Sequence, residues 1–140
     1  MPTYKNTPLG LNLPLRNGPN SGYFDQSFDS YTQIRMNIIN LLRTIPGERR
    51  MQPTFGCRLW NVVFEQNDEV VPEKINNIIR EDVSRWIPGV VVKDITTKYY
   101  SGNETTDGRD IYKLYVVVKY TIVSINQSDV VEIYLDKGKV

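Results

Sequence analysis

Two different spacings of apolar residues divide the chain into a helical part and a later part made of strands. Apolar side chains recur every three or four positions over residues 31–43 and again over residues 72–86, which predicts two amphipathic helices. Ser30 followed by Gln33 fits a capping box, so we expect Ser30 to cap the first helix. Apolar pairs four residues apart in CRLWNVVFEQND predict a helix of about two turns between the longer ones.

From Val90 onward the apolar spacing changes to alternation, which is typical of strands. Strict alternation predicts a first strand with Val91 and Ile95 on one face and with Val90 and Val92 on the other. Two further strands are predicted by the alternating residues Tyr112, Leu114, Val116, Val118, Tyr120 and Ile122, and then by Val131, Ile133 and Leu135. Short turn-forming segments separate the three runs, which predicts an antiparallel meander.

The order of these elements predicts an α+β fold, in which two longer helices and one short helix pack on a C-terminal three-stranded antiparallel sheet. The first 28 residues are rich in proline, glycine and asparagine, so they predict an extended N-terminal arm. Leu9, Leu11, Leu13 and Leu15 recur at period two and give this arm one apolar edge. The arm could dock along its own domain or on a neighbouring subunit. We therefore expect an arm at 1–28 and a single domain at 29–140.

Composition removes most catalytic schemes. The chain has 140 residues, 40% of them hydrophobic and 24% charged, as expected for one globular domain. It contains no histidine, which excludes Ser-His and Cys-His pairs. Cys57 is the only cysteine, so we expect a packed side chain, no metal site and no cofactor. The net charge of +1 favours neither nucleic acid nor membrane, and no apolar stretch is long enough to span a bilayer, so we expect a cytoplasmic protein.

Charge is unevenly distributed around the loop sequence TIPGERRMQPTFGC, which runs from Thr44 to Cys57. Five arginines and one acid between Arg35 and Arg58 give a local charge of +4, whereas the segment from Glu65 to Asp82 has a charge of −4. The two segments could complement each other within the fold, or the basic one could face a protein partner. The loop lacks the glycine and lysine spacing of a phosphate-binding loop.

Paired carboxylates are the one catalytic scheme that the composition permits. A glycosidase could use Glu48 with Glu65 or Asp68. None of these acids lies in a recognisable motif, and sixteen acids in this chain produce such pairs by chance, so solvated surface charges are favoured. A carboxylate-dependent, lysozyme-like muramidase remains the alternative function.

The stretch LLRTIPGERRMQPTFGCRLWNVVFE, from Leu41 to Glu65, resembles the signature of the contractile-tail baseplate wedge proteins. This sheath-initiator family includes the phage gene product W and T-even wedge group and is related to TssE of type VI secretion. The positions that carry the resemblance are Leu41, Leu42, Thr44, Gly47, Arg49, Pro53, Phe55, Gly56, Leu59, Phe64 and Glu65. Arg50 departs from the pattern, because some relatives have proline there.

The resemblance implies a non-enzymatic structural subunit of the virion tail baseplate that assembles in the host cytoplasm and initiates the sheath. It implies pairing of the sheet edge with strands of the tail sheath protein and contact of the loop with the helical core bundle of other wedge proteins. The tail tube is a further candidate partner, and neither nucleic acid nor membrane is expected. The candidate partner-binding residues are Glu48, Arg49, Arg50, Pro53, Phe55, Gly56, Val131, Ile133 and Leu135.

Overall fold

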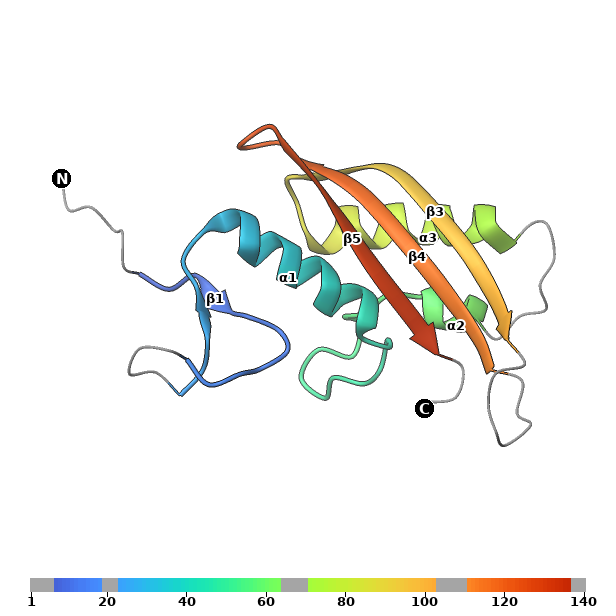
Figure 1. Cartoon of the computed structure of the whole chain (residues 1–140), viewed down its shortest axis with the longest axis horizontal. Helices are drawn as coiled ribbons and strands as arrows, with labels where there is room; N and C mark the ends of the chain where they lie inside the picture. Colours follow the sequence, from blue (N-terminus) through green and yellow to red (C-terminus); the bar gives the residue numbers. More distant parts are fainter. Residues whose placement is uncertain (1–6, 19–22, 64–70, 103–110, 137–140) are drawn as a thin grey trace.

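The computed structural model of the chain describes residues 7–18, 23–63, 71–102 and 111–136. The elements are β1 (Gly10–Leu11), β2 (Gln26–Ser27), α1 (Ser30–Arg43), α2 (Leu59–Val63), α3 (Val71–Trp86), β3 (Val90–Gly102), β4 (Ile111–Ile122) and β5 (Gln127–Asp136). Figure 1 shows them from the N-terminal part in blue to the C-terminal strand in red. The α+β fold is confirmed, with an N-terminal extended part, three helices and a C-terminal three-stranded sheet.

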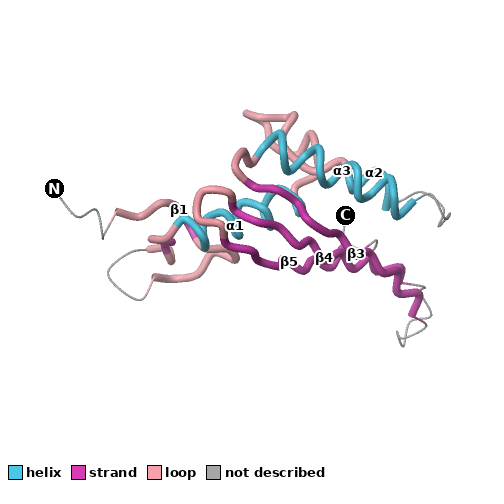
Figure 2. Tube along the Cα trace, turned by 90° about the horizontal axis from the view of Figure 1, so that it is seen from above, coloured by secondary structure: helices cyan, strands magenta, loops and turns pink. Residues whose placement is uncertain are grey.

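The sheet is antiparallel with the strand order β3-β4-β5, so the central strand comes second in the chain. Helix α3 packs against β3, and α1 packs against β5. The view from above in Figure 2 shows α2 and α3 on one side of the sheet. On the other face of the sheet, side chains such as Lys98, Lys119 and Tyr134 are exposed. Among the described residues, each of the outer strands β3 and β5 pairs with β4 alone.

The core lies between the helices and the inner face of the sheet. The predicted alternation is confirmed on the described side chains of the two later strands, because Leu114, Val116, Val118, Tyr120, Ile122, Val131, Ile133 and Leu135 are all buried. The helices contribute a matching apolar stripe that includes Ile38, Leu41, Ile75, Ile79 and Val83. Burying each such aliphatic side chain contributes about 1.5–3 kcal/mol, which makes this layer the main source of stability. Tyr112 was predicted on the same face, but its side chain lies outside the described residues.

The predicted cap of the first helix is wrong by one residue. Asp29 is the N-cap, and its carboxylate accepts a hydrogen bond of 2.8 Å from the backbone N–H of Thr32. Ser30 is instead the first helical residue, and Gln33 makes a side-chain hydrogen bond to Asn37. Asp and Ser have similar preferences for the cap position, so the sequence did not distinguish them. The backbone hydrogen bond lowers the pKa of the Asp29 carboxyl.

Strict alternation also misplaced the first residues of β3. Val90 and Val92 lie in the core together with Ile95, whereas Val91 is exposed on the outer face. The register jumps between Val92 and Asp94, so Lys93 is an extra residue that forms a β-bulge. A bulge reverses the facing of every later side chain, which explains why residues of different parity share one face.

The N-terminal part folds back on itself. β1 pairs with β2 in an antiparallel ribbon, which contacts α1 through the backbone N–H of Leu13 and the sulfur of Met36 at 3.4 Å. The predicted apolar edge is largely open, because Leu9, Leu11 and Leu15 remain exposed. The ribbon therefore touches its own domain, while docking on a neighbouring subunit stays a prediction.

Candidate functional site

The loop from Thr44 to Cys57 is closed at its base. Helix α1 ends at Thr44, whose backbone N–H bonds to the carbonyl of Asn40 at 3.1 Å. The carbonyl oxygen of Thr44 then accepts a hydrogen bond of 3.0 Å from the N–H of Cys57, at the other end of the loop. Trp60 adds a second tie, since its indole N–H donates to the carbonyl of Leu42 at 3.1 Å. The two ends of the loop are thereby joined to the same turn of helix.

Two glycines shape the loop for different reasons. Gly47 has a φ of +95° and donates its N–H to the carbonyl of Pro53 at 2.7 Å, which closes the tip of the loop. Gly56 has a φ of +137°, and a Cβ at this position would lie 2.7 Å from the Thr44 carbonyl oxygen. Only glycine fits there without a shift of the backbone. Gly56 therefore has a steric role at the base of the loop, whereas Pro53 contributes its carbonyl and an exposed ring.

The Glu-Arg-Arg sequence divides into three different environments. The carboxylate of Glu48 accepts a hydrogen bond of 3.2 Å from the N–H of Ile45, so it stabilises the loop itself. The guanidinium of Arg49 lies 4.1 Å above the ring of Phe55. Arg50 is exposed, and the next residue, Met51, is 98% exposed. The loop therefore presents cationic and apolar side chains to solvent on a fixed base.

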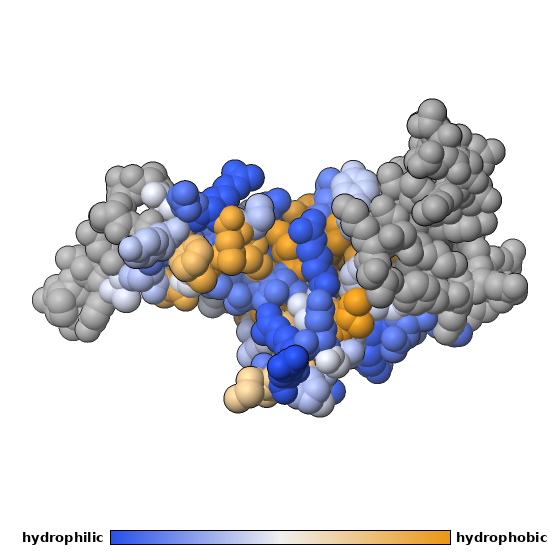
Figure 3. Space-filling model, turned by 90° about the horizontal axis from the view of Figure 1, so that it is seen from below, coloured by the Kyte–Doolittle hydropathy of each residue, from blue (hydrophilic) through white to orange (hydrophobic). Residues whose placement is uncertain are grey.

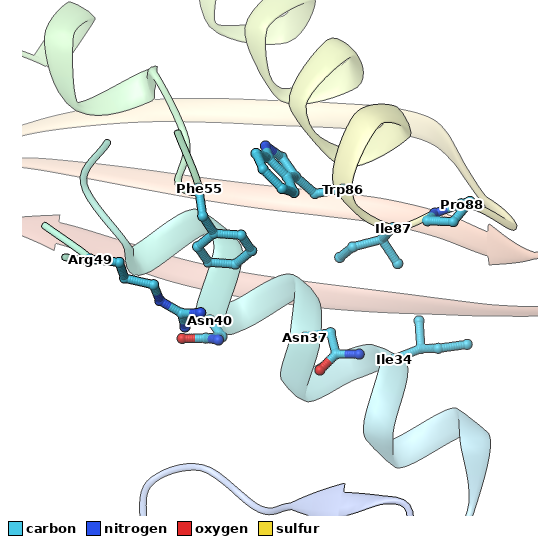
Figure 4. Close-up of a pocket in the computed structure, with 8 residues that line it drawn as sticks. All are labelled: Ile34, Asn37, Asn40, Arg49, Phe55, Trp86, Ile87 and Pro88. Carbon is cyan, nitrogen blue, oxygen red and sulfur yellow. The ribbon is translucent and has the colours of Figure 1, made fainter. Parts of the chain in front are cut away.

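A pocket of about 410 Å³ lies beside this loop. Phe55 forms one wall and packs edge-on against Trp86, with 5.2 Å between the ring centroids and an interplanar angle of 69°. Figure 4 shows that the lining comes from α1, from the loop and from the end of α3. The lining residues are Ile34, Asn37, Asn40, Arg49, Phe55, Trp86, Ile87 and Pro88. The pocket thus combines one cation, two amides and an aromatic pair, which are residue types suited to a protein partner.

Sequence reasoning missed most of this pocket. It singled out Arg49 and Phe55, but the two asparagines of α1 and Trp86 of α3 join them only in the folded chain. Asn37 and Asn40 are three residues apart on one helix, and this spacing was the only local signal for a shared polar face. The view from below in Figure 3 shows apolar surface broken into patches by hydrophilic side chains.

The internal interpretation of the uneven charge applies to Arg58, while a role of the basic segment toward a protein partner stays a prediction. Arg58 joins the acidic segment through ion pairs with Glu81 at 2.7 Å and Asp82 at 2.9 Å. Neither Arg49 nor Arg50 forms an ion pair within the described part of the chain. The internal pairing therefore accounts for Arg58 and leaves the loop arginines available to a partner.

The three candidate residues of β5 have side chains that face the core. Val131, Ile133 and Leu135 are each 1% exposed. Any contact that they make with another chain must therefore use their strand's backbone. No backbone group of β5 is hydrogen-bonded to a described segment other than β4, so the outer edge of this strand is open.

The comparison with known proteins covers most of the folded domain. A family model for the baseplate wedge protein gp25 matches residues 29–127, from the cap of α1 to the start of β5. The chain belongs to the gp25 baseplate wedge family. The resemblance carried by the loop sequence is thereby confirmed. Membership of this family gives the protein a structural role in a tail baseplate, in association with other baseplate proteins.

Two solved structures have a fold similar to that of this gp25-family chain. A Geobacter sulfurreducens protein proposed to be a tail lysozyme is 23% identical, over 76% of this chain and 90% of that chain, with a TM-score of 0.61. A chain in the baseplate of the anti-feeding prophage is 22% identical, over 81% of this chain and 83% of that chain, with a TM-score of 0.64. At these identities the similarity establishes a shared fold. A search of curated proteins gave no match.

The described part of this gp25-family chain offers little for catalysis. Burial raises the pKa of the Cys57 thiol to about 12, so the side chain stays protonated, as a packed residue should. No group of acids and cysteine in the described ranges could hold a metal ion. Glu65 and Asp68, the predicted partners of Glu48 in a muramidase, lie outside the described residues. None of the described helices could span a membrane.

Proposed function

We propose that this protein is a non-enzymatic wedge subunit that initiates the sheath of a contractile tail. In this proposal the loop pocket holds a helical segment of the wedge core, and the sheet edge accepts a strand of the sheath protein. Membership of the baseplate wedge family supports the location. The observation that carries the proposal is the open edge of β5, a strand of ten residues with no second neighbour in the described part of the chain.

Strand addition suits the chemistry of this molecule. An added strand gains its affinity from main-chain hydrogen bonds and needs no catalytic group. A contact repeated around a ring of subunits is also strengthened by avidity, so each single contact can be weak. The proposal is tested by assembling particles without this chain. We expect tail tubes that lack sheath, and a normal sheath on such tubes would contradict the proposal.

The contact with the wedge core is proposed to depend on Arg49. Arg49→Ala should prevent incorporation into the baseplate while the isolated domain stays folded, because an exposed cation–aromatic contact contributes only about 0.5–1 kcal/mol. Arg43→Ala is the matched control, since it removes the same charge from the exposed last residue of α1. Equal incorporation of the two variants would contradict a specific role for Arg49.

The lysozyme description of the Geobacter relative makes the muramidase alternative worth testing directly. The Glu48 carboxylate bonds to its own loop, which supports a structural role over an acid-base role. We expect no clearing of a cell-wall suspension by the purified protein. Clearing that is lost in Glu48→Gln would favour the enzyme.

A further inference from the structure

The pocket beside the loop carries a positive charge and no negative one. Every lining residue is neutral except Arg49. Arg49 makes no ion pair within the described part of the chain, and the adjacent Phe55 ring lies 4.1 Å from its guanidinium carbon. A guanidinium presents its N–H groups in a planar fork that matches the two oxygens of a carboxylate. The charge of the pocket therefore favours an anionic group of a partner.

A contact within α1 sets the orientation of a second donor in the pocket. Figure 4 shows Asn37 between Ile34 and Asn40 on the side of α1 that lines the pocket. The Nε2 group of Gln33 donates to Oδ1 of Asn37 at 2.9 Å, so the amide oxygen is bonded on the helix side. The Nδ2 group of Asn37 can only donate, and no described residue accepts from it. The Asn37 amide therefore offers its N–H groups to an occupant of the pocket.

The ribbon formed by β1 and β2 holds Gln33 in the orientation that this contact needs. The hydroxyl of Ser27, on β2, donates to Oε1 of Gln33, and the Ser27 residue is only 3% exposed. Gly10, on β1, lies so close to the Gln33 amide that a Cβ at this position would overlap it. The ribbon precedes residues 29–127, which match the family model. A part of the chain outside that match thus acts on the lining of the pocket.

The rest of the pocket is apolar. Phe55 and Trp86 form an edge-on aromatic pair, and Ile34, Ile87 and Pro88 complete this part of the lining. A volume of about 410 Å³ lies within the range of pockets that enclose a small molecule, so it has room for a carboxylate and a neighbouring apolar side chain. The occupant that complements both parts is an acidic side chain with an apolar side chain beside it.

We propose that this pocket binds an aspartate or glutamate side chain of another baseplate protein. Arg49 is the ionic partner of that carboxylate, and Asn37 is a further donor, which the ribbon orients through Gln33. An adjacent apolar side chain of the same partner packs on Phe55 and Trp86. This inference rests on the proposed contact of the pocket with the wedge core, and it adds the chemistry of the group that the pocket recognises.

Arg49→Lys allows the occupant to be identified by cross-linking. A carbodiimide condenses an amine with a carboxylate into an amide, with loss of water and no spacer, so the two groups must be in contact. In assembled particles we expect a link from position 49 to an acidic residue of another baseplate protein, located by mass spectrometry. Arg43→Lys is the control, because it places the same amine at the exposed last residue of α1, outside the pocket lining. Absence of a link from position 49 in the incorporated protein, or the same link from position 43, would overturn the proposal.

Asn37→Asp tests the sign of the charge that the pocket recognises. The new carboxylate still accepts the hydrogen bond from Gln33, so the contacts of α1 with the ribbon are kept, but it repels another carboxylate. In competition with the wild type for incorporation into particles, we expect the share of this variant to fall by about tenfold or more. Asn61→Asp is the control, because it adds the same charge at an exposed position of α2. Equal shares of the two variants would refute recognition of a carboxylate.

Gln33→Glu tests the orienting contact. The substituted side chain still accepts from the Ser27 hydroxyl but cannot donate to Asn37, so the Asn37 amide turns its N–H groups toward the helix. We expect a reduced share in particles when Asn37 is present, and no further reduction in an Asn37→Ala background. Equal reductions in both backgrounds would rule out the orienting role.

These outcomes are separable from failure of the proposed function. Sheath growth in the absence of the chain would contradict sheath initiation itself. Exclusion of Arg49→Ala from particles that accept Asn37→Asp would leave the contact with the wedge core in place and would contradict only the recognition of a carboxylate.

Discussion

The carboxylate of Asp82 on α3 accepts three hydrogen bonds from Arg58, the residue that precedes α2. The backbone N–H of Arg58 binds one carboxylate oxygen at 2.9 Å, and its Nε and Nη2 bind the other at 3.0 and 2.9 Å. The Asp82 side chain is only 4% exposed, so this pair fixes the end of the loop to the long helix from inside the fold. The C-terminal end of the loop is therefore held in place by a buried carboxylate on α3.

Removing this carboxylate should destabilise the whole domain. Asp82→Ala leaves the Arg58 N–H and guanidinium without their acceptor, and we expect the free energy of unfolding to fall by about 2–3 kcal/mol. Urea unfolding at neutral pH measures it. The control is Glu81→Ala, which breaks the more exposed pair of Arg58 and should cost less than about 1 kcal/mol. Similar losses of unfolding free energy in the two variants would show that the buried pair stabilises the domain no more than the exposed one.

The two loop glycines predict different responses to the same substitution. Gly47→Ala places a Cβ in open space, so the cost is that of a positive φ, about 1–2 kcal/mol. Gly56→Ala adds a clash with the Thr44 carbonyl and the Pro46 nitrogen, at 2.7 and 2.8 Å. We therefore expect a clearly lower melting temperature for Gly56→Ala than for Gly47→Ala. Equal melting temperatures would mean that the backbone at the base of the loop can shift to accept the Cβ without a loss of stability.

Asp129 predicts a dependence of stability on acid pH. Desolvation raises the pKa of its carboxyl, but favourable contacts outweigh this effect, and the pKa is lowered below its ordinary value of 3.8. These contacts come from the Val130 N–H, the hydroxyls of Tyr120 and Tyr31, and the Arg35 charge. A carboxyl with a lowered pKa in the folded state contributes stability above its unfolded pKa and loses it as the pH falls through the folded value.

Asp129→Asn should therefore be less stable than the wild type at neutral pH, and this difference should shrink as the pH falls below 3.8. Unfolding in urea between neutral pH and pH 3 measures the difference. Asp94→Asn, which removes an exposed carboxylate paired with Lys119, should keep the acid-dependent loss because Asp129 is still present. A difference in the free energy of unfolding between Asp129→Asn and the wild type that does not change with pH would contradict the predicted contribution of the Asp129 carboxylate.

Cys57 should report global opening of the domain. Its side chain is fully buried and its thiol pKa is raised to about 12 by burial, so little thiolate forms at pH 8 in the folded state. We expect a thiol reagent to label Cys57 only when urea unfolds the protein. Met51→Cys, at the exposed tip of the loop, should label at once in native buffer. Rapid labelling of native Cys57 would mean that the loop base opens locally.

The periodicity of the sequence was sufficient for the three helices, the three later strands and most of the core. It failed where a single residue decides a local structure. Asp29 and Ser30 are both good caps, and the folded helix uses Asp29. Lys93 has no mark of a bulge in the sequence, because three consecutive valines fit either face of a strand. Arg80, which donates to the carbonyls of Val92 and Lys93 at this bulge, comes from α3.

The candidate site was predictable only in its local part. The loop sequence indicated which residues turn the chain and which carry charge, since glycine, proline and arginine act through their own geometry. The pocket required Trp86 to reach Phe55, thirty-one positions earlier in the chain, and such a meeting depends on how α3 packs on the sheet.

The hydrogen bond between the backbone N–H of Cys57 and the carbonyl of Thr44 closes the segment between them into a loop with a fixed base. Because both ends are tied to one helical turn, the tip from Glu48 to Gln52 can be exchanged for the corresponding tip of another wedge protein without reopening the core. If the loop binds the wedge core as proposed above, a chimera of this kind would transfer partner choice between tails while keeping the same scaffold.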